Sequence, residues 1–179
     1  IHVRIFESLS PTPELSFAVR EYRCQAGINV TASHNPKEYN GYKVYWSDGA
    51  QLPPQHAAAI ARELEQIDIF TGIRRMEFDD AKAQGLIEIM GAETDERFMS
   101  HVMAMVNDRE SMAKVADTFH MVYTPFHGCG WKLVPEALRG LGVKHLHCVP
   151  EQMVLDGNFP TVVSPNPENP EGFYLAIQL

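Results

Sequence analysis

Ser33 is the residue whose position in the sequence best suits a catalytic role, because it lies at the junction of a predicted strand and a polar loop. It follows a short apolar run, 27–30, whose alternation is typical of a strand, and it opens a loop of turn-forming residues that extends to Gly41. A serine at such a junction is presented to solvent or to a substrate while the strand holds its backbone still. For a bare Ser-His pair, however, the ordinary interpretation is an exposed and inert turn.

Several residues near Ser33 carry groups that could take part in chemistry. His34 is a potential proton carrier and Asn35 supplies an amide. The nearest cation in the loop, Lys37, is expected to be solvated, and the next one, Lys43, falls in the strand that follows. We therefore treat 33–43 as one candidate site.

Length and composition exclude several classes of protein. The chain has 179 residues, of which 45% are hydrophobic and 21% charged, so it can form one large domain or two small ones. A net charge of −8 argues against nucleic acid as a partner. No apolar run approaches the roughly 18 residues of a membrane span. The three cysteines fit no metal-ligand spacing, so we expect reduced structural thiols and a cytoplasmic protein.

Predicted strands and helices alternate along the chain. This order favours an α/β fold, a mixed sheet flanked by helices in a three-layer α/β/α arrangement, repeated in two lobes. The pattern restarts after residue 94, so we place the domain boundary between 1–94 and 95–179. Strands are predicted at 1–6, 28–30, 42–46, 86–90, 119–123 and 145–149, and helices at 13–22, 54–64, 78–84, 95–107, 131–139 and from 170 onward. Thr12 and Asn169 are the expected caps of the first and last helices.

The candidate site resembles a known family. Segment 31–36, Thr-Ala-Ser-His-Asn-Pro, followed by 39–43, Tyr-Asn-Gly-Tyr-Lys, resembles the phosphoserine loop of the α-D-phosphohexomutases, the phosphoglucomutase and phosphomannomutase superfamily. The resemblance is greatest to the bacterial phosphoglucomutase-like branch, and it continues through 11–13, 123–128, 156–160 and 164–168. Full-length members have four domains. The resemblance implies a fragment that holds most of the first domain and the start of the second.

The resemblance implies a role for each candidate residue. Ser33 would be the catalytic phosphoserine, which gives its phosphoryl group to a sugar phosphate and takes the other back from a bisphosphorylated intermediate. Lys43 would help with proton transfer at the sugar hydroxyl. His34 would either donate a hydrogen bond or a proton, or only shape the turn. Asn35 would flank the phosphoryl group or simply hold the loop backbone.

The expected cofactors are Mg²⁺ and a primer of the glucose 1,6-bisphosphate type. In the family an Asp-x-Asp-x-Asp-Arg loop and a phosphoserine oxygen bind the metal, and this chain contains no such loop, so it would contribute Ser33 at most. The expected partner is a small sugar phosphate: glucose phosphate first, with mannose or pentose phosphate as alternatives. The chain alone should be inactive. A phosphosugar-binding module without catalysis remains the alternative of another class, and no Gly-x-Ser-x-Gly motif supports a serine hydrolase.

Two further motifs have ordinary interpretations. Segment 127–130, His-Gly-Cys-Gly, could bind an anion at a helix start, but a tight structural turn that faces the first domain is favoured. His145 and His147 alternate on a predicted strand without a third ligand, so they indicate a strand face rather than a metal site.

Overall fold

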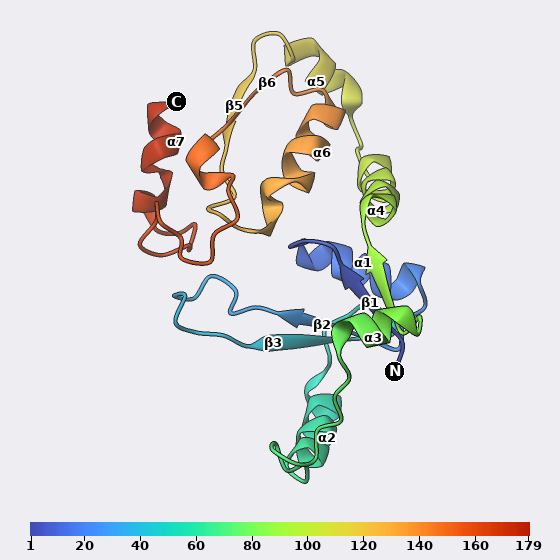
Figure 1. The fold of residues 1–179 in the computed structure, drawn as a ribbon. Helices are drawn as coiled ribbons and strands as arrows, with labels where there is room; N and C mark the ends of the chain where they lie inside the picture. The colour runs from blue at the N-terminus through green and yellow to red at the C-terminus, as the bar shows by residue number, and fades with distance from the viewer.

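The computed structural model describes residues 1–179 as two lobes joined by a helix (Figure 1). The elements of the first lobe are β1 (Val3–Phe6), α1 (Thr12–Glu21), β2 (Ala26–Val30), β3 (Tyr42–Trp46), α2 (Pro54–Leu64), α3 (Phe78–Ala83) and β4 (Ile87–Met90). The connecting helix is α4 (Ala92–Ala104). The second lobe consists of α5 (Arg109–Val115), β5 (His120–Tyr123), η1 (Cys129–Trp131), α6 (Leu133–Leu141), β6 (His145–Cys148), η2 (Pro150–Gln152), η3 (Pro170–Phe173) and α7 (Tyr174–Gln178).

The strands form three two-stranded sheets. β1 pairs with β4 in parallel, β2 with β3 in antiparallel fashion, and β5 with β6 in parallel. The predicted α/β class is therefore confirmed, and both strand directions occur. In the first lobe the parallel and antiparallel pairs belong to two separate sheets. A single loop joins β2 to β3, which makes an antiparallel hairpin, whereas a long crossover joins the parallel strands β1 and β4.

Close packing of α1 on β2 positions the strand that leads to Ser33. Phe17, Ala18 and Val19 of α1 are buried, as is Gly27 of β2. A Cβ atom at Gly27 would lie 2.7 Å from Cγ2 of Val19, so only glycine allows this approach of strand and helix. The burial of the apolar face of α1 thus fixes the course of β2.

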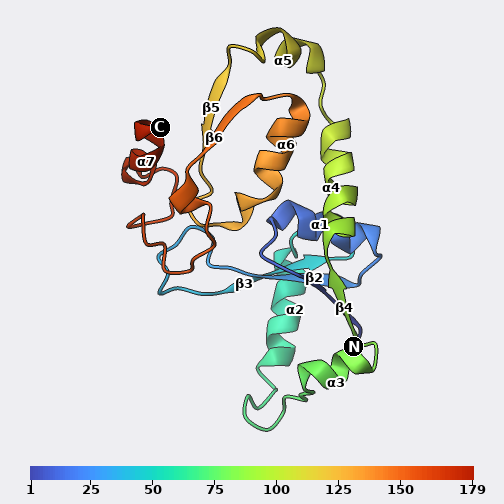
Figure 2. The same ribbon diagram turned by 45° about the horizontal axis from the view of Figure 1, so that its top comes forward.

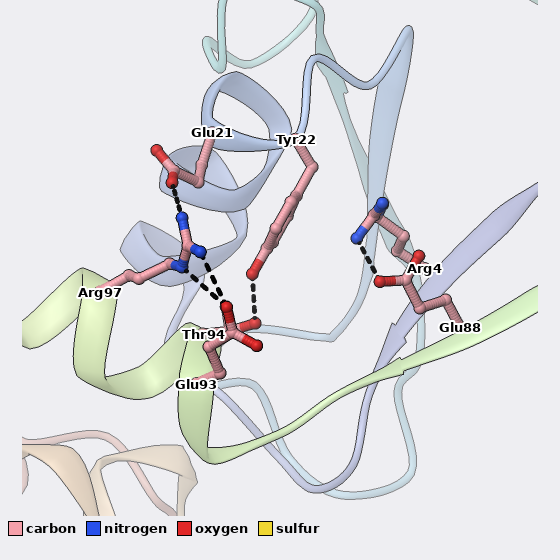
Figure 3. Close-up of polar contacts among 7 residues, drawn as sticks. All are labelled: Arg4, Glu21, Tyr22, Glu88, Glu93, Thr94 and Arg97. Atoms are coloured by element: carbon pink, nitrogen blue, oxygen red, sulfur yellow. Dashed lines mark hydrogen bonds and ion pairs between the residues drawn. The ribbon is translucent and has the colours of Figure 1, made fainter.

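Helix α4 contacts both lobes, as Figure 2 shows. Its first turns pack on α1, where the hydroxyls of Tyr22 and Thr94 are 2.7 Å apart and Arg97 pairs with Glu21 at 2.8 Å (Figure 3). Its later turns pack on α6. The predicted boundary at residue 94 falls inside this helix, so the domain division stays a prediction.

Some element boundaries differ from those predicted. Helix α4 begins three residues earlier than expected, because Gly91 precedes it and the acidic Glu93 fits its first turn. Thr12 was expected as the cap of α1 but is its first helical residue; Pro11 precedes it, and the Thr12 hydroxyl accepts a hydrogen bond from Asn29 at 2.7 Å. Asn169 makes no side-chain cap either, and the backbone after it enters a 3₁₀ turn.

Helix α5 was not predicted from the sequence. It has seven residues and none of them is buried, so no apolar stripe marks it. A local cap explains it: the Asp108 carboxylate accepts a hydrogen bond from the backbone N–H of Ser111 at 2.9 Å.

None of the helices combines the length and the apolar character needed to cross a bilayer. All three cysteines are free thiols, as expected.

Candidate active site

Ser33 lies in a cleft of about 390 Å³ between the two lobes. The first-lobe wall consists of the start of α1, the end of β2 and the loop after it. The second-lobe wall consists of the loop after β5 and the segment around residue 156. The lining includes Thr12, Asn29, Ser33 and His34 on one side, and Phe126, His127, Cys129, Asp156 and Phe159 on the other.

Ser33 is exposed and has a left-handed backbone, with φ of 61°. Its N–H donates to the Thr31 hydroxyl at 2.9 Å, which holds this turn locally. A left-handed conformation costs a side-chain-bearing residue about 1–2 kcal/mol. This strained residue turns the chain out of β2, at a point where the cleft gives its hydroxyl access to a ligand.

His34 and Asn35 differ in what they contact. The Ser33 Oγ and His34 Nδ1 atoms are 3.5 Å apart, at the outer limit of a hydrogen bond, and His34 lines the cleft. The Asn35 amide instead donates to the Ala32 carbonyl at 2.8 Å, and Asn35 does not line the cleft. The structure therefore brings His34 to Ser33, while the Asn35 amide bonds within its own loop.

Lys43 lies on the second strand of the hairpin. In the β2–β3 register it is opposite Asn29, so the two side chains share one face of the hairpin. Asn29 lines the cleft, whereas half-buried Lys43 does not; it lines a second hollow, of about 280 Å³, beside α2. Its ammonium makes no hydrogen bond or ion pair. The structure places Lys43 near the candidate site but not in its lining.

The second-lobe wall is held by a buried hydrogen-bond network around His127. This residue is 3% exposed, and its Nδ1 and Nε2 atoms lie 2.8 Å from the Val154 carbonyl and the Thr161 hydroxyl. A carbonyl only accepts, so Nδ1 carries the proton and donates. The fully buried Gln152 extends the network, because its amide donates to Thr161 and to the Gly172 carbonyl, both at 3.1 Å. His127 is thus a structural residue in this network.

The loop 125–128 uses its own backbone donors internally. The N–H groups of Phe126, His127 and Gly128 donate to the Thr124 hydroxyl, the Gln152 carbonyl and the Pro125 carbonyl respectively. Phe126 and His127 both have left-handed backbones, with φ of 47° and 62°. A loop whose donors are engaged offers none of them to an anion. The backbone N–H groups of Cys129 and Gly130, which complete the motif, are not among these donors, so the choice between a tight structural turn and an anion site stays a prediction.

The charges at the cleft are few. Asp156 is the one carboxylate in its lining, and neither Lys nor Arg lines it. Partial desolvation raises the pKa of the Cys129 thiol, although the residue as a whole is exposed. Burial also raises the pKa of Tyr123, to about 12, and its hydroxyl donates to the Gly130 carbonyl at 3.0 Å.

The residues of this chain do not complete a metal site. No group of three or more His, Cys, Asp or Glu side chains is arranged to hold a metal ion. Ser33, through a phosphate, would supply a single ligand, so these residues by themselves do not fit a bound Mg²⁺ ion.

Among the cleft residues that were not predicted as site residues from the sequence are Thr12, Asn29, Asp156 and Phe159. Thr12, Asp156 and Phe159 lie within the motifs of the resemblance, which was the available signal. Asn29 had no signal beyond its place in β2.

Comparison with known proteins agrees with this fold. Residues 1–69 match the family model described as phosphoglucomutase/phosphomannomutase, alpha/beta/alpha domain I, and residues 96–179 match that of domain II. The two models together cover most of the chain. The chain belongs to the phosphoglucomutase/phosphomannomutase family.

Individual relatives carry the same names. The chain is 35% identical over 175 residues to a phosphoglucomutase of Staphylococcus saprophyticus and 37% identical over 183 residues to one of Staphylococcus haemolyticus. These matches cover 98% and 99% of the chain but 31% of each relative, so the chain spans about a third of their length.

Two solved structures share the fold. A putative phosphomannomutase from Thermus thermophilus matches 99% of the chain and 36% of its own, with a TM-score of 0.71 at 22% identity. A phosphoglucomutase/phosphomannomutase family protein from Burkholderia thailandensis matches 95% of the chain and 33% of its own, with a TM-score of 0.61 at 20% identity.

Proposed function

We propose that the complete protein carrying this chain is a phosphohexomutase that interconverts hexose 1-phosphate and 6-phosphate, with glucose phosphate as its substrate. The observation that carries the proposal is the exposed Ser33, which lines the interlobe cleft in a left-handed turn of the β2–β3 hairpin. Family membership and the phosphoglucomutase names of the relatives support the reaction and the sugar.

In this proposal Ser33 carries the phosphoryl group. As the Oγ–P bond of phosphoserine breaks, a sugar hydroxyl oxygen forms a new bond to phosphorus and releases its proton. The bisphosphorylated sugar then turns over in the cleft, and its other phosphoryl group returns to Ser33. His34, with Nδ1 3.5 Å from Oγ, is placed to donate a hydrogen bond to the phosphate or to take the hydroxyl proton.

Charge compensation is the second requirement. A phosphoserine carries about two negative charges at neutral pH, and no Lys or Arg lines the cleft. We assign part of this compensation to Lys43, which shares a hairpin face with Asn29. The rest we assign to Mg²⁺, whose further ligands must come from outside this chain. Asn35 keeps the role of holding the phosphate-bearing loop, because its amide donates to the Ala32 carbonyl. A cytoplasmic location and a hexose bisphosphate primer complete the proposal.

Phosphate mapping tests the proposal. The complete protein is incubated with glucose 1,6-bisphosphate, digested, and analysed by peptide mass spectrometry. The matched control is Ser47→Ala, which removes an exposed serine outside the loop and should leave the phosphorylation unchanged. Phosphate is expected on Ser33 alone, with turnover of glucose 1-phosphate faster than that of mannose 1-phosphate or ribose 1-phosphate. Phosphate mainly elsewhere would refute the nucleophile. Sugar binding without any transfer would instead identify a binding module.

A further inference from the structure

A buried carboxyl group lies where the two lobes and α4 meet. Glu14, in the first turn of α1, is 0% exposed, and neither of its carboxylate oxygens has a hydrogen-bond partner. Asp95 at the start of α4 and Lys132 just before α6 act on it, and these two form an ion pair with each other. None of the three lines the cleft, so a role for them is independent of the function proposed for Ser33.

The arrangement requires a proton. A buried carboxylate without a donor is strongly disfavoured, and Asp95, as an ionised group, can only accept hydrogen bonds. A proton on Glu14 resolves both difficulties, because its O–H can then donate to the Asp95 carboxylate. One negative charge remains, and Lys132 compensates it. Lys132 is 43% exposed and Asp95 only 15%, so the cluster reaches solvent on the side of the second lobe.

We propose that Glu14 and Asp95 share one proton, with Lys132 as counter-ion, and that this proton clamps α1 of the first lobe to α4 and to the start of α6 in the second. Loss of the proton leaves two largely buried carboxylates facing one ammonium. The contact between α1 and α4 then loosens, because Lys132, which is paired with Asp95, compensates only one of the two charges. Because the first turn of α1 also contains Thr12, which lines the cleft, the cleft opens as the clamp is lost.

The pKa of Glu14 agrees with this geometry. Burial is the largest cause, and the Asp95 carboxyl follows, since two carboxyl groups can hydrogen-bond only when a proton lies between them and otherwise repel; together these causes raise the pKa of Glu14 to about 7. Ser10 and Lys132 act in the opposite direction. The ion pair with Asp95 in turn raises the pKa of Lys132, so the counter-ion stays charged throughout the range in which Glu14 titrates.

Apart from Asp95 and Lys132, no charged group is among the causes that shift the pKa of Glu14. Of the strands that pack on α1, β2 presents the uncharged Asn29, and β3 carries Lys43 on the same face. From α6, Glu136 acts on Lys132. The titrating group that joins the lobes is therefore Glu14, and its partner from the connecting helix is Asp95.

The direction of the pH dependence follows from the raised pKa. The folded chain keeps the Glu14 proton to about pH 7, whereas an unfolded chain loses it near 4.5. Between these values the native state binds more protons, so stability falls as the pH rises. The contribution is complete below the unfolded value and is lost as the pH passes through about 7.

Carbon-13 NMR of the glutamate carboxyl groups in the 179-residue chain measures the proton directly. One glutamate is expected to titrate near pH 7, and this signal should be absent from Glu14→Gln and present in Glu63→Gln, a change at an exposed position of α2. If Glu14→Gln does not fold, Asp95→Asn should lower the midpoint and Lys132→Met should raise it. Uniform titration below about pH 5.5, or a high midpoint that survives all three variants, would overturn the proposal.

Amide hydrogen exchange tests the clamp itself. After correction for the pH dependence of intrinsic exchange, protection in peptides from α1, α4 and α6 is expected to fall above about pH 7 in the wild type and in Glu63→Gln. In Glu14→Gln it should stay constant. Peptides from α2, which lies away from the cluster, provide the internal reference (Figure 2). Equal pH dependence in wild type and Glu14→Gln would show that the lobes are held by something else.

Discussion

The two walls of the cleft are held in contrasting ways. On the first-lobe wall, Ser33 and His34 are exposed, and the loop's side-chain hydrogen bonds reach no farther than three residues along the chain. On the second-lobe wall, His127 is buried and bonds to residues 27 and 34 positions away. The reactive group thus stands on a locally held turn that a ligand can reach, while the opposite wall is a rigid template fixed by long-range contacts.

Both walls nevertheless use left-handed backbone at residues other than glycine. Ser33 has φ of 61° on one side, and Phe126 and His127 have φ of 47° and 62° on the other. At His127 the buried network offsets the conformational cost. Ser33 is exposed and has no comparable network to offset its conformational cost, so we associate its strain with function. Substitutions on each wall should therefore separate a structural role of the left-handed backbone, at His127, from a functional role, at Ser33.

The largest expected effect is that of Ser33→Ala in the complete protein. Mutase turnover should fall at least about 1,000-fold, because the variant lacks the phosphoryl acceptor. Stability should not change measurably, since the side chain is exposed. A coupled assay with glucose 1-phosphate and urea unfolding measure the two quantities. Activity within about tenfold of the wild type would place the nucleophile elsewhere.

The opposite wall should respond in stability instead. Gln152→Leu leaves Thr124, Thr161 and the Gly172 carbonyl without their buried partner, so the free energy of unfolding should decrease by about 3 kcal/mol. Gln25→Leu, at an exposed position, should change it by less than about 0.5 kcal/mol. Urea unfolding of the chain gives both values. Equal effects of the two variants would mean that the second-lobe network does not hold this wall.

The two walls also differ in how far the sequence predicts them. The hairpin that carries Ser33 was predictable, because alternation in β2 and β3 and a run of turn-formers between them are local signals. The buried role of His127 was not, since its partners Val154 and Thr161 are far along the chain. Likewise Glu14 has the sequence context of an ordinary first-turn acid of a helix, and only packing against α4 buries it.

An intermediate effect is expected from Lys43→Met in the complete protein. If the Lys43 ammonium compensates charge during transfer, kcat should fall about 100-fold while the fold is preserved. Lys37→Met, at an exposed position in the loop, is the matched control and should change kcat little. A rise in KM alone would limit Lys43 to substrate binding. If neither kcat nor KM changes, Lys43 has no role in the reaction, and the functional residues of this wall are those that line the cleft.

The smallest effect concerns the strain at Ser33 itself. Glycine tolerates φ of 61°, so Ser33→Gly removes a conformational cost of about 1–2 kcal/mol from the folded state. It also adds about 0.4–1 kcal/mol of conformational entropy to the unfolded state. The difference predicts a gain in stability of between about 0 and 1.6 kcal/mol, and each kcal/mol raises the Tm by about 2–4 °C for a chain of this size. Ser33→Ala, which keeps the side-chain carbon, should show no such rise. Because both variants lack the hydroxyl, any gap between their Tm values reflects the relief of backbone strain less the entropy that glycine adds to the unfolded state. Equal Tm values would mean that the loop relaxes around Ser33, and that the strain on the two walls is not comparable.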